Sequence, residues 1–219
     1  MTYLLDIEGT CLPVSFVYES LFPYARKRLL TGATLSEAEQ SGLDAEREAD
    51  LQAGLKPPSG EIDYLVWLMD QDRKSTTLKS VQGRLWKSGF LSGELVAPLY
   101  PDVPPALERW HSLGHTIAIF SSGSVEAQQL LFAHTTQGDF SPLLSHYFDT
   151  TTGPKKQASS YTAIAAKLNM LPSEIVFVSD IVEELDAARA AGFASRLALR
   201  PGNAPQPASA HKPIHTFDE

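Results

Sequence analysis

The sequence predicts an α/β protein whose core is a doubly wound parallel sheet, with an all-helical segment inserted into that core. After residue 100, short apolar runs alternate with helical patterns, which is typical of a parallel sheet covered on both faces. Between the first apolar run and residue 100 the patterns are helical and no strand pattern occurs. We therefore expect a core of residues 1–14 and 100–219 and an inserted helical unit, a cap, of residues 15–99.

The core elements follow from apolar runs bounded by turn and cap residues. Short buried runs predict strands, and longer periodic segments that begin near serine and end near glycine predict helices. Gly192, for example, suits the position just after a helix end. The expected strands are 3–5, 116–120, 175–178 and 196–199, and the expected helices are 125–134, 160–168 and 182–191. The segment 201–212 is rich in Pro and Ala and is expected to run along the surface.

The inserted unit is predicted to contain helices over 35–55, 62–69 and 77–88, and the Pro-containing stretch 97–101 would return the chain to the core. Its basic side chains cluster beside a single acid, Asp72; they are Arg73, Lys74, Lys79, Arg84 and Lys87. Lys79 and Arg84 lie off the apolar face of their helix. They either form a solvated helix face or attract a phosphorylated ligand.

The composition excludes several classes of protein. A formal net charge of −8 argues against a general nucleic-acid binder, and the single cysteine, Cys11, excludes a disulfide framework. Cys11 does not begin a Cys-x5-Arg phosphatase motif, because the sixth residue after it is Val17. No signal peptide or bilayer-spanning stretch is visible. We expect a cytoplasmic monomer with no membrane or nucleic-acid partner.

Polar side chains follow the predicted strands at the points where the strands end. Ligands of open α/β sheets bind beyond the carboxyl ends of the strands, so these residues are the candidate site. In chain order they are Asp6, Glu8, Gly9, Thr10, Ser121, Ser122, Gly123, Ser124, Asp149, Gly153, Lys155, Lys156, Ser179, Asp180, Glu183 and Glu184.

This set of side chains fits a magnesium ion and a phosphoryl group. Mg²⁺ prefers hard oxygen ligands, and Asp6 and Asp180 from two strand ends can share one ion. The ion would relieve the charge repulsion between Asp6 and Glu8. A carboxylate can attack phosphorus. Lys155 would neutralise phosphoryl oxygens, and Ser121 with nearby backbone N–H groups would bind them.

The motifs also resemble those of a known family. DIEGT, LFPYA, DRKSTTLKSVQG, SSGSVEAQQLLFAHT, YFDTTTGPK and FVSDIVEELDAA, in this order, are similar to enolase-phosphatase (acireductone synthase) of the haloacid dehalogenase superfamily. The resemblance implies a fold of the haloacid dehalogenase type and one Mg²⁺ per chain. It also implies conversion of 2,3-diketo-5-methylthiopentyl-1-phosphate, a small phosphorylated diketone, to 1,2-dihydroxy-3-keto-5-methylthiopentene and phosphate in methionine salvage. Two steps would share one site: enolisation, then dephosphorylation.

The resemblance also assigns roles by motif position. Asp6 would be the nucleophile and a metal ligand, Glu8 would be catalytic and bind the metal through its backbone carbonyl, and Asp180 would be the third protein ligand. The implied phosphate contacts are Ser121, Ser122 and Lys155, and the implied supporting residues are Gly9, Thr10, Gly123 and Glu184.

The sequence departs from the family pattern at two places. Pro154 stands where a His often precedes the motif lysine, and Glu183 stands where an Arg is expected after Asp180. Glu8 itself stands where most of the superfamily has Asp. An enolate leaves with less help from an acid than an alkoxide does, so the longer side chain is tolerable. We hypothesise that Glu8 instead moves a proton during enolisation.

Other readings remain open at this point. The chain is alternatively a sibling phosphatase acting on another small phosphorylated metabolite, a phosphoacceptor domain that is phosphorylated at Asp6, or a dehalogenase. Ser121, Ser122 or Ser124 would serve as a helix cap, and Lys156 and Glu183 as solvated charges.

Overall fold

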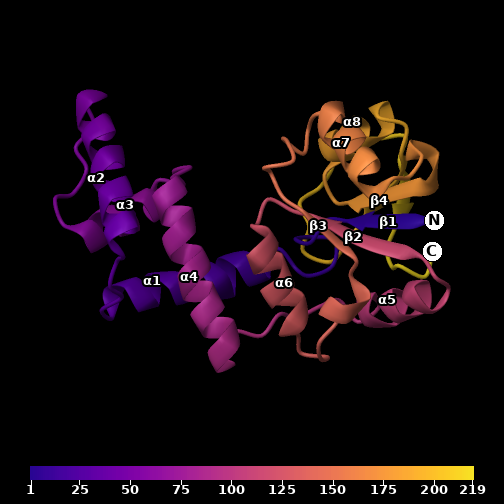
Figure 1. Cartoon of the computed structure of the whole chain (residues 1–219), viewed down its shortest axis with the longest axis horizontal. Coiled ribbons are helices and arrows are strands. Elements are labelled where there is room, and N and C mark those ends of the chain that lie inside the picture. Colours follow the sequence, from indigo (N-terminus) through magenta and orange to yellow (C-terminus); the bar gives the residue numbers. More distant parts are fainter. The chain divides into compact units, whose positions relative to one another are not determined.

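The computed structural model describes residues 1–219 and divides into two compact units (Figure 1). The core unit is Met1–Val17 together with Val96–Glu219, and the inserted unit is Tyr18–Leu95. Both junctions lie a few residues inside the expected insert of 15–99. The chain leaves and rejoins the core at neighbouring points, because the Tyr100 N–H donates to the Cys11 carbonyl over 2.9 Å.

The core is a six-stranded parallel sheet, which confirms the predicted fold class. The strand order is β3-β2-β1-β4-β5-β6, and every neighbouring pair is parallel. The strands are β1 (Thr2–Leu5), β2 (Thr116–Phe120), β3 (His146–Phe148), β4 (Ile175–Ser179), β5 (Ala194–Ala198) and β6 (Lys212–Ile214). β1 lies in the middle, between β2 and β4. From β1 the chain adds β2 and β3 on one side and then β4, β5 and β6 on the other, so the direction in which strands are added reverses at β1. This reversal is the point at which doubly wound sheets bind their ligands.

Helices cover both faces of this sheet. They are α5 (Val103–Ser112), α6 (Val125–Ala133), α7 (Ala158–Leu168) and α8 (Val182–Ala190). Figure 1 shows α7 and α8 on one face and α5 on the other. Under α7 and α8 the fully buried ring of Tyr161 packs against Phe120 and Phe177. The β-branched and aromatic strand residues thus sit in a continuous apolar layer, as expected for strands buried on both faces.

The inserted unit has four α-helices around its own apolar core. They are α1 (Phe22–Leu30), α2 (Glu37–Gln52), α3 (Glu61–Asp70) and α4 (Thr76–Ser92), and a π-helical turn (Val17–Leu21) leads into α1. Leu43, Tyr64 and Val81 are fully buried there. Ser36 and Glu39 form a capping box at the start of α2. The sequence pattern missed α1, which begins with Phe22-Pro23 at a junction between units.

Two arginines of the basic cluster form ion pairs within the inserted unit. Arg84 donates to both carboxylate oxygens of Glu39 over 3.0 Å and to the Thr34 carbonyl over 2.8 Å. Arg73 forms an ion pair with the buried carboxylate of Asp50. These two guanidinium groups therefore stabilise the packing of α2 against α4 and of α2 against the turn after α3.

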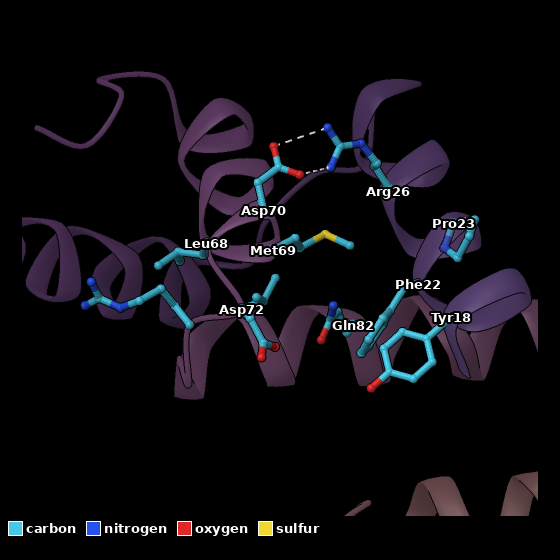
Figure 2. A pocket seen from close by; sticks show the side chains of 11 residues that line it. Tyr18, Phe22, Pro23, Arg26, Leu68, Met69, Asp70, Asp72 and Gln82 are labelled. Atoms are coloured by element: carbon cyan, nitrogen blue, oxygen red, sulfur yellow. Dashed lines mark hydrogen bonds and ion pairs between the residues drawn. The ribbon is translucent and has the colours of Figure 1, made fainter. Parts of the chain in front are cut away.

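The inserted unit also contains a cavity of about 310 Å³ (Figure 2). Tyr18 and Phe22 line it from the α1 side, and Leu68 and Met69 come from α3. The two side chains Arg26 and Asp70 form a partly exposed ion pair at its edge. The cavity is thus mostly apolar with a charged edge.

The C-terminal segment differs in one respect from the expectation. Residues 201–210 run along the surface without regular structure, as predicted, but Lys212–Ile214 then forms the edge strand β6. Its central residue is Pro213, which is tolerated at an edge strand because only one side of the strand needs N–H donors. No helix in the chain is both long and apolar enough to cross a membrane.

Candidate active site

Asp6 lies at the carboxyl end of the central strand β1 and is buried. Its N–H continues the sheet by donating to the Val178 carbonyl of β4 over 2.9 Å. The backbone N–H of Ile7 donates to Asp6 Oδ1 over 2.8 Å, and the Ser179 hydroxyl contacts Asp6 Oδ2 at 3.1 Å. The carboxylate is therefore fixed in one orientation by the ends of two adjacent strands.

Lys155 is the cation of the site. Its Nζ lies 2.7 Å from Asp6 Oδ1 and 2.7 Å from Glu184 Oε2, and its side chain is only 10% exposed. Burial alone would lower the pKa of this ammonium, but the two carboxylates outweigh burial and raise it. Lys155 is therefore charged at neutral pH, and it offsets part of the negative charge around Asp6.

The loop that carries Lys155 is held by the first turn of α7. The Tyr161 hydroxyl donates to the Lys155 carbonyl over 2.7 Å, and the Ser160 hydroxyl donates to the Pro154 carbonyl over 2.7 Å. Gly153 has φ +143°, and a Cβ there would meet Ser160 Oγ at 2.4 Å. Pro154, the departure from the family pattern, thus occupies a loop whose shape is set by its carbonyl contact.

Asp180 and Glu184 come from the end of β4 and the first turn of α8. Burial and the nearby charge of Asp6 raise the pKa of Asp180 to about 7. Burial and Asp6 likewise raise the pKa of Glu184 to about 7, although Lys155 opposes the rise. Both side chains are buried. Together with Asp6 they make three carboxyl groups around the single ammonium group of Lys155, so one positive charge does not balance them all.

The side chain of Glu8 reaches the carboxyl end of β2, which pairs with β1. The Ser121 hydroxyl donates to Glu8 Oε2 over 3.2 Å, and the Gly123 N–H donates to Ser121 Oγ over 3.2 Å. Burial, and then repulsion from Asp6, raise the pKa of Glu8. Ser121 is fully buried at the end of β2, whereas Ser122 is exposed. Of the serines considered as helix caps, Ser124 caps α6 by accepting from the Ala127 N–H.

The backbone of Gly9 packs closely against the side chain of Asp180. Its φ is +72°, a conformation that favours glycine, and a Cβ at this position would lie 2.4 Å from Asp180 Oδ2. The next residue, Thr10, is fully buried and its hydroxyl has no hydrogen-bond partner among the protein atoms. The tight turn thus brings backbone, rather than a side chain, up to the carboxylate of Asp180.

The chemistry of the donor set fits Mg²⁺. Asp6 and Asp180 offer hard carboxylate oxygens with no His or Cys ligand between them, and burial, followed by the charge of Asp6, raises the pKa of Asp180. No group of three His, Cys, Asp or Glu side chains is gathered tightly enough to hold a metal alone. An ion with few protein ligands and several waters suits this arrangement, because Mg²⁺ usually keeps its waters.

The structure brings together most of the residues that the strand-end argument selected. Asp6, Lys155 and Glu184 are in direct contact, Glu8 contacts Ser121, and Gly9 abuts Asp180. Lys156 lies outside this cluster: it is exposed and pairs with exposed Glu183 at 3.8 Å.

Ser179 was among the strand-end residues named from the sequence, but no role was assigned to it. In the structure its hydroxyl lies 3.1 Å from both Asp6 Oδ2 and Glu184 Oε2.

Comparison with known proteins identifies the class of protein. The family model described as haloacid dehalogenase-like hydrolase matches residues 1–192 of this chain. Enolase-phosphatase E1 of Synechococcus elongatus is 52% identical over 100% of this chain and 96% of its own length. Enolase-phosphatase E1 of Sorangium cellulosum is 49% identical over 99% and 95%. The chain belongs to the haloacid dehalogenase-like hydrolases and, among them, to the enolase-phosphatase family.

A solved structure supports the same fold. The UTR4 protein of Saccharomyces cerevisiae superimposes with a TM-score of 0.81 at 35% sequence identity, and the match covers 99% of this chain and 98% of the yeast chain.

Proposed function

We propose that the protein is a bifunctional enolase-phosphatase of methionine salvage. It would convert 2,3-diketo-5-methylthiopentyl-1-phosphate to 1,2-dihydroxy-3-keto-5-methylthiopentene and phosphate. The observation that carries the proposal is the contact of Lys155 with Asp6 at the end of the central strand, in a chain 52% identical to enolase-phosphatase E1 over its full length.

In the phosphatase step, a carboxylate oxygen of Asp6 attacks phosphorus, and the bond from phosphorus to the enol oxygen breaks. The leaving enolate takes up a proton to become the enol. Water then hydrolyses the aspartyl phosphate, which releases phosphate and restores the Asp6 carboxylate. Lys155 stays close to the reacting carboxylate and neutralises charge on the phosphoryl oxygens. Ser121, at the end of the neighbouring strand β2, would bind a phosphoryl oxygen, and the Gly123 N–H donates to its hydroxyl.

Asp6, Asp180 and the backbone carbonyl of Glu8 would hold Mg²⁺. The bound ion supplies positive charge that stabilises the phosphoryl oxygens and lowers the repulsion between the carboxylates. Gly9 has no side chain, so its backbone packs against Asp180 at a place where a Cβ would lie 2.4 Å from Asp180 Oδ2.

Glu8 is the proposed proton carrier of the enolisation step. General acid–base catalysis works best when the pKa of the group is near the operating pH, and burial beside Asp6 moves the pKa of Glu8 in that direction. The hydrogen bond from Ser121 orients the carboxyl group. Glu8 would take a proton from the substrate carbon and return one to oxygen.

One assay distinguishes the candidate functions. The purified protein is given the diketo phosphate with Mg²⁺, and enol absorbance and free phosphate are followed together. An enol that forms before or with phosphate supports the proposal. Phosphate without an enol product indicates a sibling phosphatase, and stable labelling of Asp6 without turnover indicates a phosphoacceptor domain.

Two variants assign the steps. Asp6→Asn is expected to abolish phosphate release, because the amide does not attack phosphorus. Glu8→Gln is expected to slow enolisation, and normal enolisation with slow phosphate release would refute the proposed role of Glu8.

We also propose a cytoplasmic monomer with one Mg²⁺ per chain. Light scattering tests the monomer, and calorimetric stoichiometry tests the metal count.

A further inference from the structure

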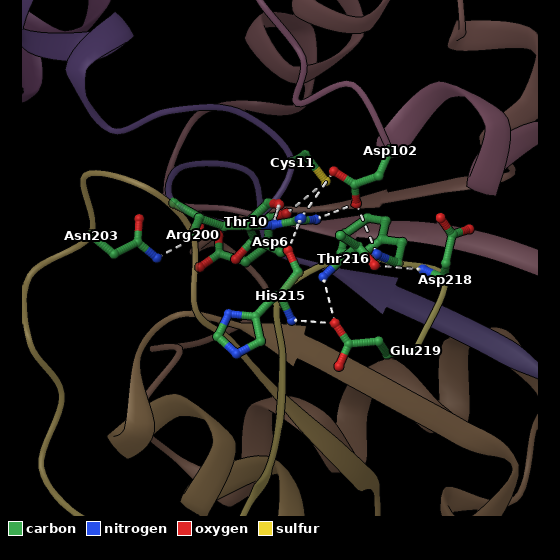
Figure 3. A network of polar contacts seen from close by, with 12 residues as sticks. Asp6, Thr10, Cys11, Asp102, Arg200, Asn203, His215, Thr216, Asp218 and Glu219 are labelled. Carbon is green, nitrogen blue, oxygen red and sulfur yellow. Dashed lines mark hydrogen bonds and ion pairs between the residues drawn. The ribbon is translucent and has the colours of Figure 1, made fainter.

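Arg200 is a buried arginine two residues after the end of β5, and the reaction described above does not use it. Its guanidinium donates to the Thr10 carbonyl over 3.1 Å, to Asp102 over 3.0 Å and to the His215 carbonyl over 2.6 Å (Figure 3). The group lies over the ring of Tyr100 at 4.9 Å and of Phe217 at 4.6 Å. This one side chain therefore joins four separate segments of the core.

Asn203 approaches the same loop three residues later. Its Nδ2 donates to the Gly9 carbonyl over 2.9 Å and contacts the Ala198 carbonyl at 3.3 Å. Both partners are acceptors, which fixes the orientation of the amide. Its Oδ1 is buried without a protein partner and would lie 3.1 Å from a Cβ on Gly9.

The two contacts fall on consecutive carbonyls of the turn that follows the nucleophile. Arg200 holds Thr10, Asn203 holds Gly9, and Asp180 abuts Gly9 from another direction. The peptide between Glu8 and Gly9 adjoins these fixed groups. The Glu8 carbonyl shares a planar peptide unit with the Gly9 N–H, which donates to the Leu12 carbonyl over 2.8 Å, and only φ and ψ of Gly9 separate that unit from the Gly9 carbonyl. Fixing the Gly9 carbonyl therefore restricts the direction of the Glu8 carbonyl.

The ion pair of Arg200 extends the restraint to the rest of the core. The carboxylate of Asp102 binds Arg200 and also accepts from the Phe217 N–H over 2.8 Å. The Tyr100 hydroxyl donates to the Pro201 carbonyl over 3.1 Å. The segment 200–203 is thus tied to the chain on both sides, so it is a firm base from which to hold the turn.

We propose that Arg200 and Asn203 are positioning residues that clamp the Gly9–Thr10 turn and thereby set the spacing between Asp6, the Glu8 carbonyl and Asp180. This inference rests on the proposed phosphoryl transfer at Asp6. Neither residue touches the reacting atoms. Groups that orient catalytic or metal-binding residues typically change rates by about 10- to 100-fold when they are removed.

The decisive variant is Asn203→Ala, since Asn203 is partly exposed and its loss leaves the Arg200 ion pair in place. We expect kcat to fall about 10- to 100-fold with KM within about twofold, because the substrate contacts remain. The matched control is Gln206→Ala. Gln206 is a partly buried amide of the same segment that contacts the Val182 N–H and the Ala204 carbonyl but not the turn.

A binding measurement separates positioning from mere packing. Vanadate resembles the transition state of phosphoryl transfer, and inorganic phosphate resembles the ground state. Asn203→Ala is expected to weaken inhibition by vanadate by about the same factor as kcat, with inhibition by phosphate changed less than about twofold. A kcat within twofold of the unmodified protein, or an equal weakening of both inhibitors, would overturn the proposal.

Arg200→Lys provides the second arm, with Arg109→Lys as its control. Arg109 also holds the C-terminus, through Asp218 and the Phe217 carbonyl, but it does not contact the Gly9–Thr10 turn. The same loss of kcat is expected in Arg200→Lys and not in Arg109→Lys; equal losses would contradict the clamp.

All rates are measured both with the diketo phosphate and with p-nitrophenyl phosphate. If only the second is hydrolysed, the proposed substrate is wrong while the clamp is still tested.

Discussion

Lys155 Nζ lies 2.7 Å from the carboxylates of both Asp6 and Glu184, so a single buried cation joins the end of β1 to the first turn of α8. The ammonium also lies 5.8 Å from the ring centre of Phe120 on β2. Charge and position are therefore coupled: the same side chain that neutralises the acids also fixes the distance between them.

Removing this cation is expected to affect both stability and rate. Lys155→Ala leaves Asp6 and Glu184 buried beside each other without a counter-charge, and breaking a buried pair costs about 3–5 kcal/mol. We expect a phosphatase rate lower by about 10²- to 10³-fold. Lys156→Ala is the control, because Lys156 is 63% exposed and makes only a 3.8 Å ion pair. Equal rates for the two variants would contradict this role for Lys155. Denaturant unfolding and steady-state kinetics measure the two effects.

The close approach of Gly9 to Asp180 gives a second prediction. Gly9→Ala places a Cβ 2.4 Å from Asp180 Oδ2, whereas Gly114→Ala has nothing within 4 Å at nearly the same φ, +73° against +72°. Gly114→Ala is expected to cost only the left-handed strain, about 1–2 kcal/mol. Gly9→Ala is expected to lose more stability and to bind Mg²⁺ more weakly. Thermal unfolding and calorimetry test this, and similar losses in both variants would show that the contact with Asp180 is unimportant.

The acidic pKa shifts predict how stability depends on pH. Asp180 and Glu184 have pKa values of about 7 in the folded protein, against 3.8 and 4.5 as ordinary values. Between about pH 4.5 and 7 the folded state therefore binds more protons than the unfolded state, so stability without metal falls as the pH rises through this range. Mg²⁺ binding needs ionised Asp180. We expect Mg²⁺ to raise the unfolding temperature more at pH 8 than at pH 5.5, and an equal rise at both values would contradict the assignment.

Cys11 is expected to be chemically silent in the folded protein. It is fully buried, burial raises the pKa of its thiol, and its Sγ contacts the Asp6 carbonyl at 3.1 Å. Only the thiolate is nucleophilic, so iodoacetamide at pH 8 should leave the native chain unlabelled and label it fully in denaturant. Mass spectrometry gives the answer, and rapid labelling of the native chain would mean that the turn after Asp6 opens readily.

The strand-end rule explains why much of the site was predictable. Asp6 and Ser121 each follow an apolar run directly, Asp180 follows the end of β4 one residue after its apolar run, and parallel strands bring such positions to one edge. The rule says nothing of side chains further along a loop. Asn203 reaches the turn only because segment 200–203 folds back after β5, and no local pattern encodes that path.

The missed elements have similar physical causes. β6 is three residues long with Pro213 at its centre, so it shows neither alternation nor strong strand propensity. It exists because β5 offers an edge for pairing. Arg200 was overlooked because a buried, paired arginine is indistinguishable in sequence from an exposed one; its burial follows from Asp102, almost a hundred residues away.

The hydrogen bond from the Tyr100 N–H to the Cys11 carbonyl closes the core where the inserted unit leaves and returns. With respect to the core, the residues between Cys11 and Tyr100 form one long loop whose ends are held together by this hydrogen bond. Loop-closure entropy grows slowly, and each doubling of length adds only about 0.6 kcal/mol. Evolution is therefore free to lengthen, shorten or replace the insert almost without disturbing the sheet. Strand β1 and the insert can therefore diverge at different rates within one gene.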